Sequence, residues 1–305
     1  MPELPEVENM IRMLKSYENK QITDVYLSGK SLRQPLNCNF IPEVSKKIIL
    51  KVERLAKYVI FTLSDSTIMV AHAGMSGRFL AKTHFNLNKE PPAKHDHVVL
   101  YLTDTKSSLS SGSSSCKSSE ISYSITFNDP RRFGMFYSIQ ASDLAKAPFK
   151  QQLGPDALDP TLNAKYLALR FNRSTTSIKS TLLNQKIISG IGNIYASEIL
   201  FYSKIHPLRP TFSLTLPEIE ILLYNTKIVL EKAISLGGST LKDYKKPDGS
   251  LGGFQHKFAV YNKAGKRCIM CSKIVDEDLS RQKCEIKKIT QNGRSTFYCE
   301  NIQKI

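Results

Sequence analysis

The sequence is poor in the features that mark membrane, secreted and disulfide-stabilised proteins. It contains no run of eighteen apolar residues, so no segment is predicted to span a bilayer. No charged leader followed by an apolar core stands at the start, so no secretory signal peptide is expected. Only six cysteines occur in 305 residues, and four of them follow residue 260. That clustering favours a metal site in a reducing compartment over a disulfide framework, and it predicts a cytoplasmic protein.

Acidic residues are scarce relative to basic ones. The chain has 43 lysines and arginines against 27 aspartates and glutamates, so its net charge is +16 and its pI is about 9.5. A polyanionic partner is therefore expected, because each basic side chain placed on a phosphate releases a condensed counterion. Composition alone does not separate nucleic-acid-processing, ribosomal and membrane-surface proteins.

The hydrophobic pattern divides the chain into three parts. Short strand-like segments fill residues 22–136, and 51–63 is interpreted as one of them. Helical spacing dominates after about residue 150, and the tail returns to strand-like segments, including 257–262, around the cysteines. These changes predict domains at 1–150, 151–262 and 263–305.

Two local segments give sharper predictions. The serine-rich stretch 106–120 cannot build a core, so it is predicted to be a flexible hairpin insertion that carries Cys116 as an exposed free thiol. A long helix is predicted over about 216–235, because Thr215 and Glu218 have the spacing of a capping box.

The first residues allow two interpretations. Helical spacing is seen at Val7, Met10, Ile11 and Leu14. Pro5 suits the first turn of that helix, so Pro2 and Glu3 precede it, and glutamates at its positive end are favourable. The catalytic interpretation is that removal of Met1 exposes the Pro2 amine, which attacks a sugar C1′. Glu3 could then move protons, and Glu6 could orient one of the two groups.

Three further stretches carry candidate residues. Lys57 begins an apolar strand, where a lysine usually reaches water but could instead donate a proton or contact a phosphate. In AHAGMSGRF two glycines flank Met75, which predicts a tight turn: either a hairpin with a surface methionine or a wedge for a base stack. NDPRRFG carries Arg131 beside Phe133, and an arginine next to an exposed aromatic ring indicates nucleic-acid binding.

Histidine and glycine pairs are less specific. His95 and His97 share one face of a strand, so they could bind a metal, contact a phosphate or simply be solvated. Gly190 and Gly192 lead into a helix predicted to begin near Asn193, whose free N–H groups could bind phosphate. Most turns of this kind are only turns.

The tail contains one complete metal knuckle and one broken one. Cys268 and Cys271 have the spacing of a zinc knuckle. Cys299 would need a second cysteine three residues later to form another knuckle, but that residue is Ile302. Cys284 is the spare thiol of the tail. The possibilities are an all-thiolate site that uses Cys284, a weak three-ligand site, or no metal.

As a set, these motifs resemble the bacterial formamidopyrimidine-DNA glycosylases, the Fpg or MutM type of the Fpg/Nei group. The matching stretches are MPELPEVE, RLAKY, HAGMSGRF, KHDHV, NDPRRFG, LGPDAL, IKSTLLNQKIISGIGNIYASEILF, GGSTLKDY, DGSLGGFQHKFAVYNKAGKRC and GRSTFYC. They occur in family order over nearly the whole chain. The serine-rich insertion and a smaller one near 275–285 have no match.

The resemblance implies a fold and an activity. The fold would be α+β and multidomain: an N-terminal β-sandwich flanked by helices, a helix-two-turns-helix domain and a C-terminal β-hairpin zinc finger. The activity would be that of a bifunctional DNA glycosylase and AP lyase, which flips 8-oxoguanine or a formamidopyrimidine out of duplex DNA and then performs β,δ-elimination. Damaged double-stranded DNA would be the partner of a monomeric, nucleoid-associated enzyme that needs no membrane, and one zinc ion would be the cofactor.

The resemblance also assigns roles to residues of this chain. Pro2 would be the Schiff-base nucleophile, Glu3 its proton donor, and Lys57 and Arg294 the proton donors of β- and δ-elimination. The gap left by the flipped base would be filled by Met75, Arg131 and Phe133. The DNA backbone would be contacted by His95, Arg131, Arg173, Lys179 and Asn193. Zinc would be held by Cys268, Cys271, Cys299 and, as the candidate fourth ligand, Cys284.

Three departures from the family pattern bear on these roles. Ser174 and Thr175 replace the usual basic residues before TSIK, which puts one phosphate contact in doubt and leaves Arg173 as the nearest cation. Ala73 replaces a leucine, which is expected to be a neutral packing change. Ile302 removes a zinc ligand, and a small hairpin without its metal is not expected to hold Arg294 in place.

Two other functions fit part of the sequence. A lesion-binding relative without catalysis fits the broken knuckle but not the retention of Pro2, Glu3, Lys57 and Arg294. A zinc-ribbon RNA-binding protein fits the charge and the cysteines but leaves the Pro2–Glu3 start unexplained.

Overall fold

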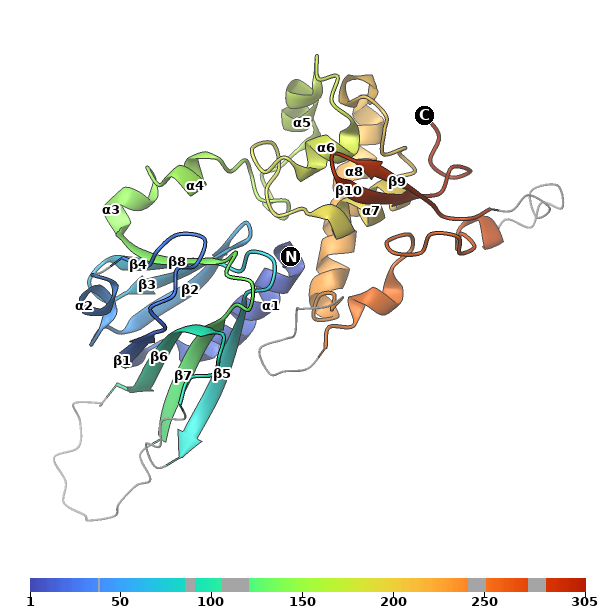
Figure 1. Ribbon diagram of the computed structural model, residues 1–305. Helices are drawn as coiled ribbons and strands as arrows, with labels where there is room; N and C mark the ends of the chain where they lie inside the picture. Colours follow the sequence, from blue (N-terminus) through green and yellow to red (C-terminus); the bar gives the residue numbers. More distant parts are fainter. Residues whose placement is uncertain (38, 86–90, 106–120, 241–250, 274–283) are drawn as a thin grey trace, which may run out of the picture. The chain divides into compact units, whose positions relative to one another are not determined.

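Two four-stranded antiparallel sheets make up most of the first of two units in the structure, a computed structural model (Figure 1). The structure describes residues 1–37, 39–85, 91–105, 121–240, 251–273 and 284–305. The first unit comprises Met1–Pro2, Glu6–Gln151 and Ser239–Gly252. The second comprises Glu3–Pro5, Gln152–Gly238 and Gly253–Ile305.

The two sheets of the first unit share one apolar core. One sheet has the order β1 (Lys20–Leu27), β6 (Asp96–Asp104), β7 (Ile121–Asn128) and β5 (Arg78–Phe85). The other has the order β2 (Ile49–Leu55), β3 (Tyr58–Leu63), β4 (Thr67–His72) and β8 (Met135–Gln140). Phe79 and Phe127 of the first sheet meet Phe136 of the second with ring centroids 5.6 to 6.2 Å apart. Each buried ring contributes about 2–3 kcal/mol, so this contact between sheets confirms the predicted sandwich.

Helices complete the first unit. Helix α1 (Leu4–Leu14) buries Val7, Met10, Ile11 and Leu14 in the sandwich core, which confirms the predicted helix. The others are short: a 3₁₀ turn at Lys15–Tyr17, α2 (Phe40–Val44), α3 (Ala141–Leu144) and α4 (Pro148–Gln151).

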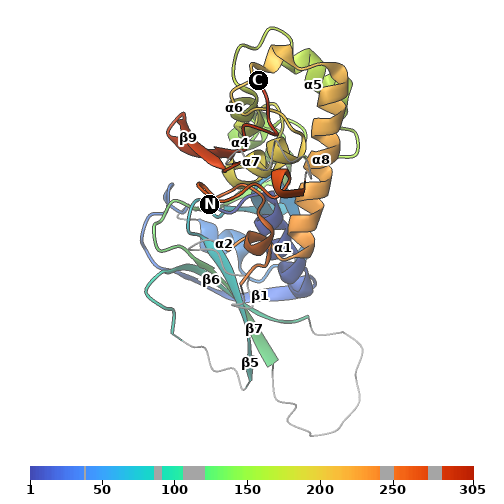
Figure 2. The same ribbon diagram turned by 90° about the vertical axis from the view of Figure 1, so that its right-hand side faces the viewer.

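The second unit is helical and ends in a hairpin (Figure 2). Its helices are α5 (Ala164–Phe171), α6 (Ile178–Leu183), α7 (Asn193–Tyr202) and α8 (Leu216–Ser235). Its hairpin pairs β9 (Lys287–Gln291) with β10 (Arg294–Tyr298), and 3₁₀ turns lie at Thr211–Ser213, Phe254–Lys257 and Cys271–Lys273. Helix α7 is buried from Ile194 to Phe201 because apolar residues occur on every side of it, and the buried Glu198 binds the loop at 259–261, so α7 forms the centre of this unit.

The long helix α8 confirms the prediction made from its cap. The backbone N–H of Thr215 donates to the carboxylate of Glu218 at 2.8 Å, which closes the capping box. The Arg209 guanidinium, which hydrogen-bonds that carboxylate, lowers the pKa of Glu218 to about 2.

Two strand predictions are wrong. Residues 51–63 form two strands, β2 and β3, because Ala56 takes a left-handed conformation (φ 55°) and reverses the chain just before Lys57. Residues 257–262 form no strand, because the N–H groups of Ala259, Val260 and Tyr261 donate to the carboxylate of Glu198 instead of to a neighbouring strand.

The turn around Met75 is not a hairpin. Strand β4 pairs with β3 and β8, whereas β5 pairs with β7 in the other sheet, so residues 73–77 cross between sheets. The predicted serine-rich insertion joins β6 and β7, which pair antiparallel; residues 106–120 and Cys116 lie outside the described residues. Within the described chain, none of the helices combines the length and apolar character of a membrane crossing.

Candidate functional site

The carboxylate of Glu3 lies at the N-terminus of α7. It accepts hydrogen bonds from the backbone N–H groups of Ile194 at 2.9 Å and Tyr195 at 3.3 Å, and the residue is only 3% exposed. These donors are unpaired within the helix, and the helix dipole favours a negative charge at this end. The predicted phosphate site at the N-terminus of this helix is therefore not available at these two N–H groups, because the Glu3 carboxylate accepts hydrogen bonds from both.

Gly192 makes this arrangement possible. A Cβ atom at position 192 would lie 2.5 Å from Oε1 and 2.6 Å from Cγ of Glu3. The backbone of Gly192 is extended (φ −126°), so its missing side chain is required for space and not for conformation. The glycine was visible in the sequence, but its contact with Glu3 was not. Pro2, the residue before Glu3, is buried and precedes α1, while Met1 is 53% exposed.

In the first unit, Lys57 occupies the β2–β3 turn and is 6% exposed. Burial, followed by the charges of Lys57 and Arg33, lowers the pKa of His72 to about 4. His72 also accepts a hydrogen bond at Nδ1 from the N–H of Gly74 at 3.0 Å, so it is a neutral imidazole at pH 7. Sequence reasoning missed His72, although its position at the end of β4, next to the Met75 turn, was visible.

A buried carboxylate joins the two loops that carry the predicted wedge residues. Asp129 is fully buried and accepts hydrogen bonds from Ser76 Oγ at 2.6 Å and the Gly134 N–H at 2.7 Å. The N–H of Arg131 donates to it as well, at 3.3 Å. A Cβ at Gly74 would lie 2.7 Å from the nitrogen of Gly134, so the loops are also in close contact through their backbones.

This clamp leaves the three wedge candidates facing solvent. Met75 is 41% exposed, Phe133 is 45% exposed and Arg131 is exposed too. The guanidinium carbon of Arg131 lies 4.9 Å from the centroid of the Phe133 ring, a cation–π contact. Large apolar side chains on two rigidly joined loops are suited to insertion into a base stack.

The two histidines before and in β6 have different environments. His97 is buried, and its two ring nitrogens contact Ser28 Oγ at 2.9 Å and the Asp129 carbonyl at 3.0 Å, which leaves neither for a metal. His95 is partly exposed and lines a cavity of 300 Å³. The other cationic side chains of that cavity are Lys30, Lys94 and Arg132, which sequence reasoning did not assign. Such a cationic cavity is suited to a phosphate.

In the second unit, two side chains fix the hairpin beside Arg294. Lys179 Nζ donates to the Ser295 carbonyl at 3.0 Å and to Thr296 Oγ1 at 2.6 Å, and Asn193 Nδ2 donates to the same carbonyl at 3.0 Å. Burial is the main cause that lowers the pKa of Lys179 to about 8. Arg294 itself is exposed at the start of β10, after a two-residue turn, and lines a cavity of 240 Å³ with Lys179.

Arg173, the remaining cationic candidate, is exposed between α5 and α6 with a left-handed backbone (φ 69°). Its neighbours Ser174 and Thr175 carry no charge, so within this short stretch Arg173 alone carries a positive charge that could contact a phosphate.

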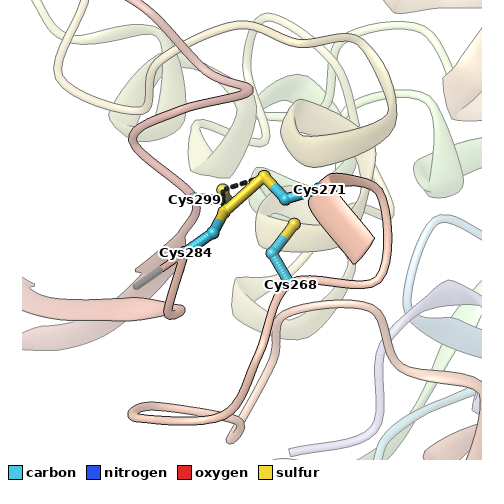
Figure 3. Close-up of side chains that lie close together, drawn as sticks. All are labelled: Cys268, Cys271, Cys284 and Cys299. Carbon is cyan, nitrogen blue, oxygen red and sulfur yellow. Dashed lines mark hydrogen bonds between the residues drawn. A yellow bond between two sulfur atoms is a disulfide. The ribbon is translucent and has the colours of Figure 1, made fainter. Parts of the chain in front are cut away.

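The four cysteines of the tail converge (Figure 3). The sulfur atoms of Cys268, Cys271, Cys284 and Cys299 all lie within 4.8 Å of one another. Cys271 and Cys284 are joined in a disulfide, and the sulfur of Cys299 lies 3.6 Å from the first and 3.5 Å from the second. Burial, with the neighbouring Cys268 adding to it, raises the pKa of Cys299 to about 11.

The donor set fits zinc. Four thiolates around one tetrahedral zinc ion, with Zn–S bonds of about 2.3 Å, are about 3.8 Å apart. The sulfur of Cys299 already has this spacing from two of its neighbours. Reduction of the disulfide would supply the other two thiolates, so the cluster can hold a metal ion.

The chain matches known proteins over its whole length. Residues 1–136 match the family described as Formamidopyrimidine-DNA glycosylase N-terminal domain, and residues 153–245 match the one described as Formamidopyrimidine-DNA glycosylase H2TH domain. The formamidopyrimidine-DNA glycosylase of Wolbachia sp. subsp. Drosophila simulans (strain wRi) is 38% identical over 304 residues, which cover 99% of this chain and 100% of that protein. The protein of the same name from Zymomonas mobilis subsp. mobilis is 37% identical over 305 residues, with 100% of both chains covered.

Solved structures agree with this similarity. The Lactococcus lactis Fpg in complex with DNA containing an abasic site has a TM-score of 0.80 and 29% identity, with 100% of both chains covered. The same values hold for the wild-type Lactococcus lactis protein in complex with DNA containing an oxidized pyrimidine. The fold implied by the sequence resemblance is thereby confirmed.

Proposed function

This chain belongs to the formamidopyrimidine-DNA glycosylase family, and we propose that it excises oxidised purines from duplex DNA and then cleaves the strand as an AP lyase. Glycosylase action on damaged DNA is supported by the family, by the full-length relatives and by neighbours solved with damaged DNA. We propose the lyase step, the preference for 8-oxoguanine and formamidopyrimidines, and the roles of individual residues from the chemistry of the site.

The observation that carries the proposal is the placement of Glu3. The residue that follows Pro2 in the chain has its carboxylate fixed by two N–H groups of α7, in a space kept open by Gly192. Once Met1 is removed, the secondary amine of Pro2 attacks C1′ of the damaged nucleotide, and the bond to the base breaks. Glu3 carries the proton that the Pro2 amine gives up to the departing base, and ring opening, in which O4′ takes a proton from water, then gives an iminium between Pro2 and the sugar.

Two cationic side chains serve the elimination steps. Lys57 is buried in the β2–β3 turn, and Arg294 starts β10 next to a carbonyl locked by Lys179 and Asn193. Lys57 acts as the proton donor of β-elimination and Arg294 as that of δ-elimination. A side chain that transfers a proton must be held in a defined position. Burial supports this for Lys57, and the fixed backbone at Ser295 supports it for the neighbouring Arg294.

The clamped loops serve base flipping. Extrusion of a nucleotide costs a few kcal/mol in lost stacking and pairing. Met75, Arg131 and Phe133 fill the vacated space, and the Asp129 clamp keeps their spacing fixed. His95, Arg173, Lys179 and Asn193 are the proposed contacts to the DNA backbone. His95 is supported by its cationic cavity, and Lys179, which also holds the hairpin, is supported by the cavity that it lines with Arg294.

Zinc is the proposed metal of the four-cysteine cluster. When bound, the ion supplies no chemistry to the reaction and only stabilises the hairpin that carries Arg294. We further propose that the protein acts as a monomer in the cytoplasm, at the nucleoid.

Borohydride trapping tests the function. Wild-type protein on an 8-oxoguanine:cytosine duplex with sodium borohydride is expected to give a covalent adduct, and peptide mass analysis is expected to place it on Pro2. Glu3→Gln is the matched control: it keeps the amine, so it should form the adduct on a preformed abasic site but not on the lesion duplex.

Two other outcomes would refute the proposal. Tight binding to lesion DNA without an adduct on either substrate would indicate a lesion-binding protein that has lost catalysis. Preference for RNA over lesion DNA in competition would indicate an RNA-binding protein.

A further inference from the structure

Given the zinc ion proposed above, on which this assignment rests, we infer that Cys284 is the fourth zinc ligand and replaces the cysteine that Ile302 displaced. The metal site has then kept its four thiolates while one ligand has moved to another part of the chain. It is now completed from the segment before β9 and not from the knuckle after β10.

Backbone pairing brings Cys284 to the first knuckle. The N–H of Cys268 donates to the carbonyl of Cys284 at 2.9 Å, and Arg267 forms an antiparallel bridge with Glu285. One step further out, the N–H of Ile286 donates to the carbonyl of Lys266, also at 2.9 Å. These contacts set the register independently of any sulfur, so the position of Cys284 is a property of the fold.

Position 302 keeps the turn of a knuckle without its donor atom. The N–H groups of Ile302 and Gln303 both donate to the carbonyl of Cys299, at 3.2 and 2.8 Å, as in a tight turn that follows a ligand. The side chain of Ile302 is partly buried against the apolar cluster that contains the cysteines. Isoleucine therefore fills the space with packing, and Cys284, which is 8% exposed, supplies the missing sulfur.

The disulfide joins Cys271 and Cys284, two of the four sulfurs that the zinc site needs, so the disulfide and the zinc site exclude each other. Metal binding requires that a reductant such as a phosphine first breaks the Cys271–Cys284 bond: the disulfide takes two electrons and two protons, and the phosphine becomes its oxide with oxygen from water. Zinc then displaces the thiol protons as it binds.

Metal titrations of the reduced, full-length protein test the assignment. Wild type is expected to bind one zinc per chain, and with cobalt(II) to show the strong sulfur-to-metal charge-transfer and d–d bands of a tetrahedral four-thiolate site. Cys284→Ser is expected to lower the zinc affinity by about a hundredfold or more, since roughly a quarter of the ligand set is lost. Cys116→Ser removes a cysteine outside the described residues and should change neither the affinity nor the spectrum.

A second variant keeps the test decisive if Cys284→Ser does not fold. Cys284→His retains a donor atom, so it should bind cobalt(II) with a weaker charge-transfer band, as expected for three thiolates and one imidazole. Wild-type affinity in Cys284→Ser, or a wild-type cobalt spectrum in Cys284→His, would overturn the assignment and leave the proposed zinc site standing.

Failure of the proposed zinc site or of the proposed glycosylase function would give different results. Absence of zinc and cobalt binding in the reduced wild type would overturn the metal site and this ligand together. A borohydride adduct measured on the same sample reports separately whether the glycosylase proposal holds.

Discussion

Replacement of Gly192 by alanine isolates the contribution of the Glu3 position. The added Cβ would lie 2.5 Å from Oε1 and 2.6 Å from Cγ of Glu3, whereas non-bonded carbon atoms normally stay about 3.5–4.0 Å apart. Glu3 must therefore move by about 1 Å, and a catalytic group displaced that far loses about a hundredfold in rate. The backbone of residue 192 accepts alanine without strain, so the effect comes from the carboxylate.

Single-turnover excision of 8-oxoguanine measures this loss. Gly192→Ala is expected to slow base removal about a hundredfold, while borohydride trapping on a preformed abasic site, which needs Pro2 and no base departure, falls far less. Gly253→Ala is a control from the same unit, because its Cβ would only approach the Leu236 carbonyl oxygen at 3.2 Å. Excision at the wild-type rate in Gly192→Ala would refute the role of Glu3 as positioned by α7.

Three further predictions concern buried polar groups. Asp129→Asn is expected to lower the unfolding free energy by about 2 kcal/mol and to weaken lesion-DNA binding, because an amide NH₂ would face the donors of Ser76 and the loop. Chemical denaturation measures the stability and fluorescence anisotropy measures the DNA affinity. Wild-type values of both would contradict the clamp. Acidification from pH 7 to pH 5 is expected to lower the unfolding free energy by about 2 kcal/mol through His72. The pKa of His72, about 4, lies below the ordinary 6.5, so the unfolded chain takes up the proton first. The loss begins as pH falls through 6.5; urea denaturation at each pH measures it, and a His72→Gln variant with the same pH dependence would exclude this source. Glu198→Gln is expected to weaken the bonds to the loop at Tyr261 by about 1–3 kcal/mol, and unchanged hydrogen exchange there would argue against that anchor.

Patterns local in sequence predicted the helices well. The apolar spacing from Val7 to Leu14 and the Thr215–Glu218 cap each depend on residues within one or two helical turns. The first helix contains the predicted apolar positions, and the second has the predicted extent. The strand error at 257–262 came from a contact that no local pattern contains. A carboxylate on α7 removed 259–261 from any sheet, because three of its N–H groups found a stronger, charged acceptor.

The candidate site shows the same division. The motif resemblance predicted roles for individual residues, and the cysteine count named Cys284 as a possible ligand. The sequence did not reveal that the N-terminus of α7 binds Glu3, because Glu3 and Ile194 are separated by 191 residues along the chain. His72 and the cationic cavity of Lys30, Lys94 and Arg132 were likewise invisible, because burial and convergence are properties of the folded chain.

The hairpin that carries Arg294 is held in place both at its base and at its tip. Its base is held by the cysteine cluster, and its tip is held by Asn292, which donates to Ser180 Oγ at 2.9 Å, and by the Ser295 carbonyl, which receives Lys179 and Asn193. Loss of the proposed zinc ion would therefore release only one end. If the proposed zinc ion is bound, chelation should loosen the base of the hairpin while the tip stays docked. The proposed strand-cleavage step should then decline gradually, and later than zinc is lost.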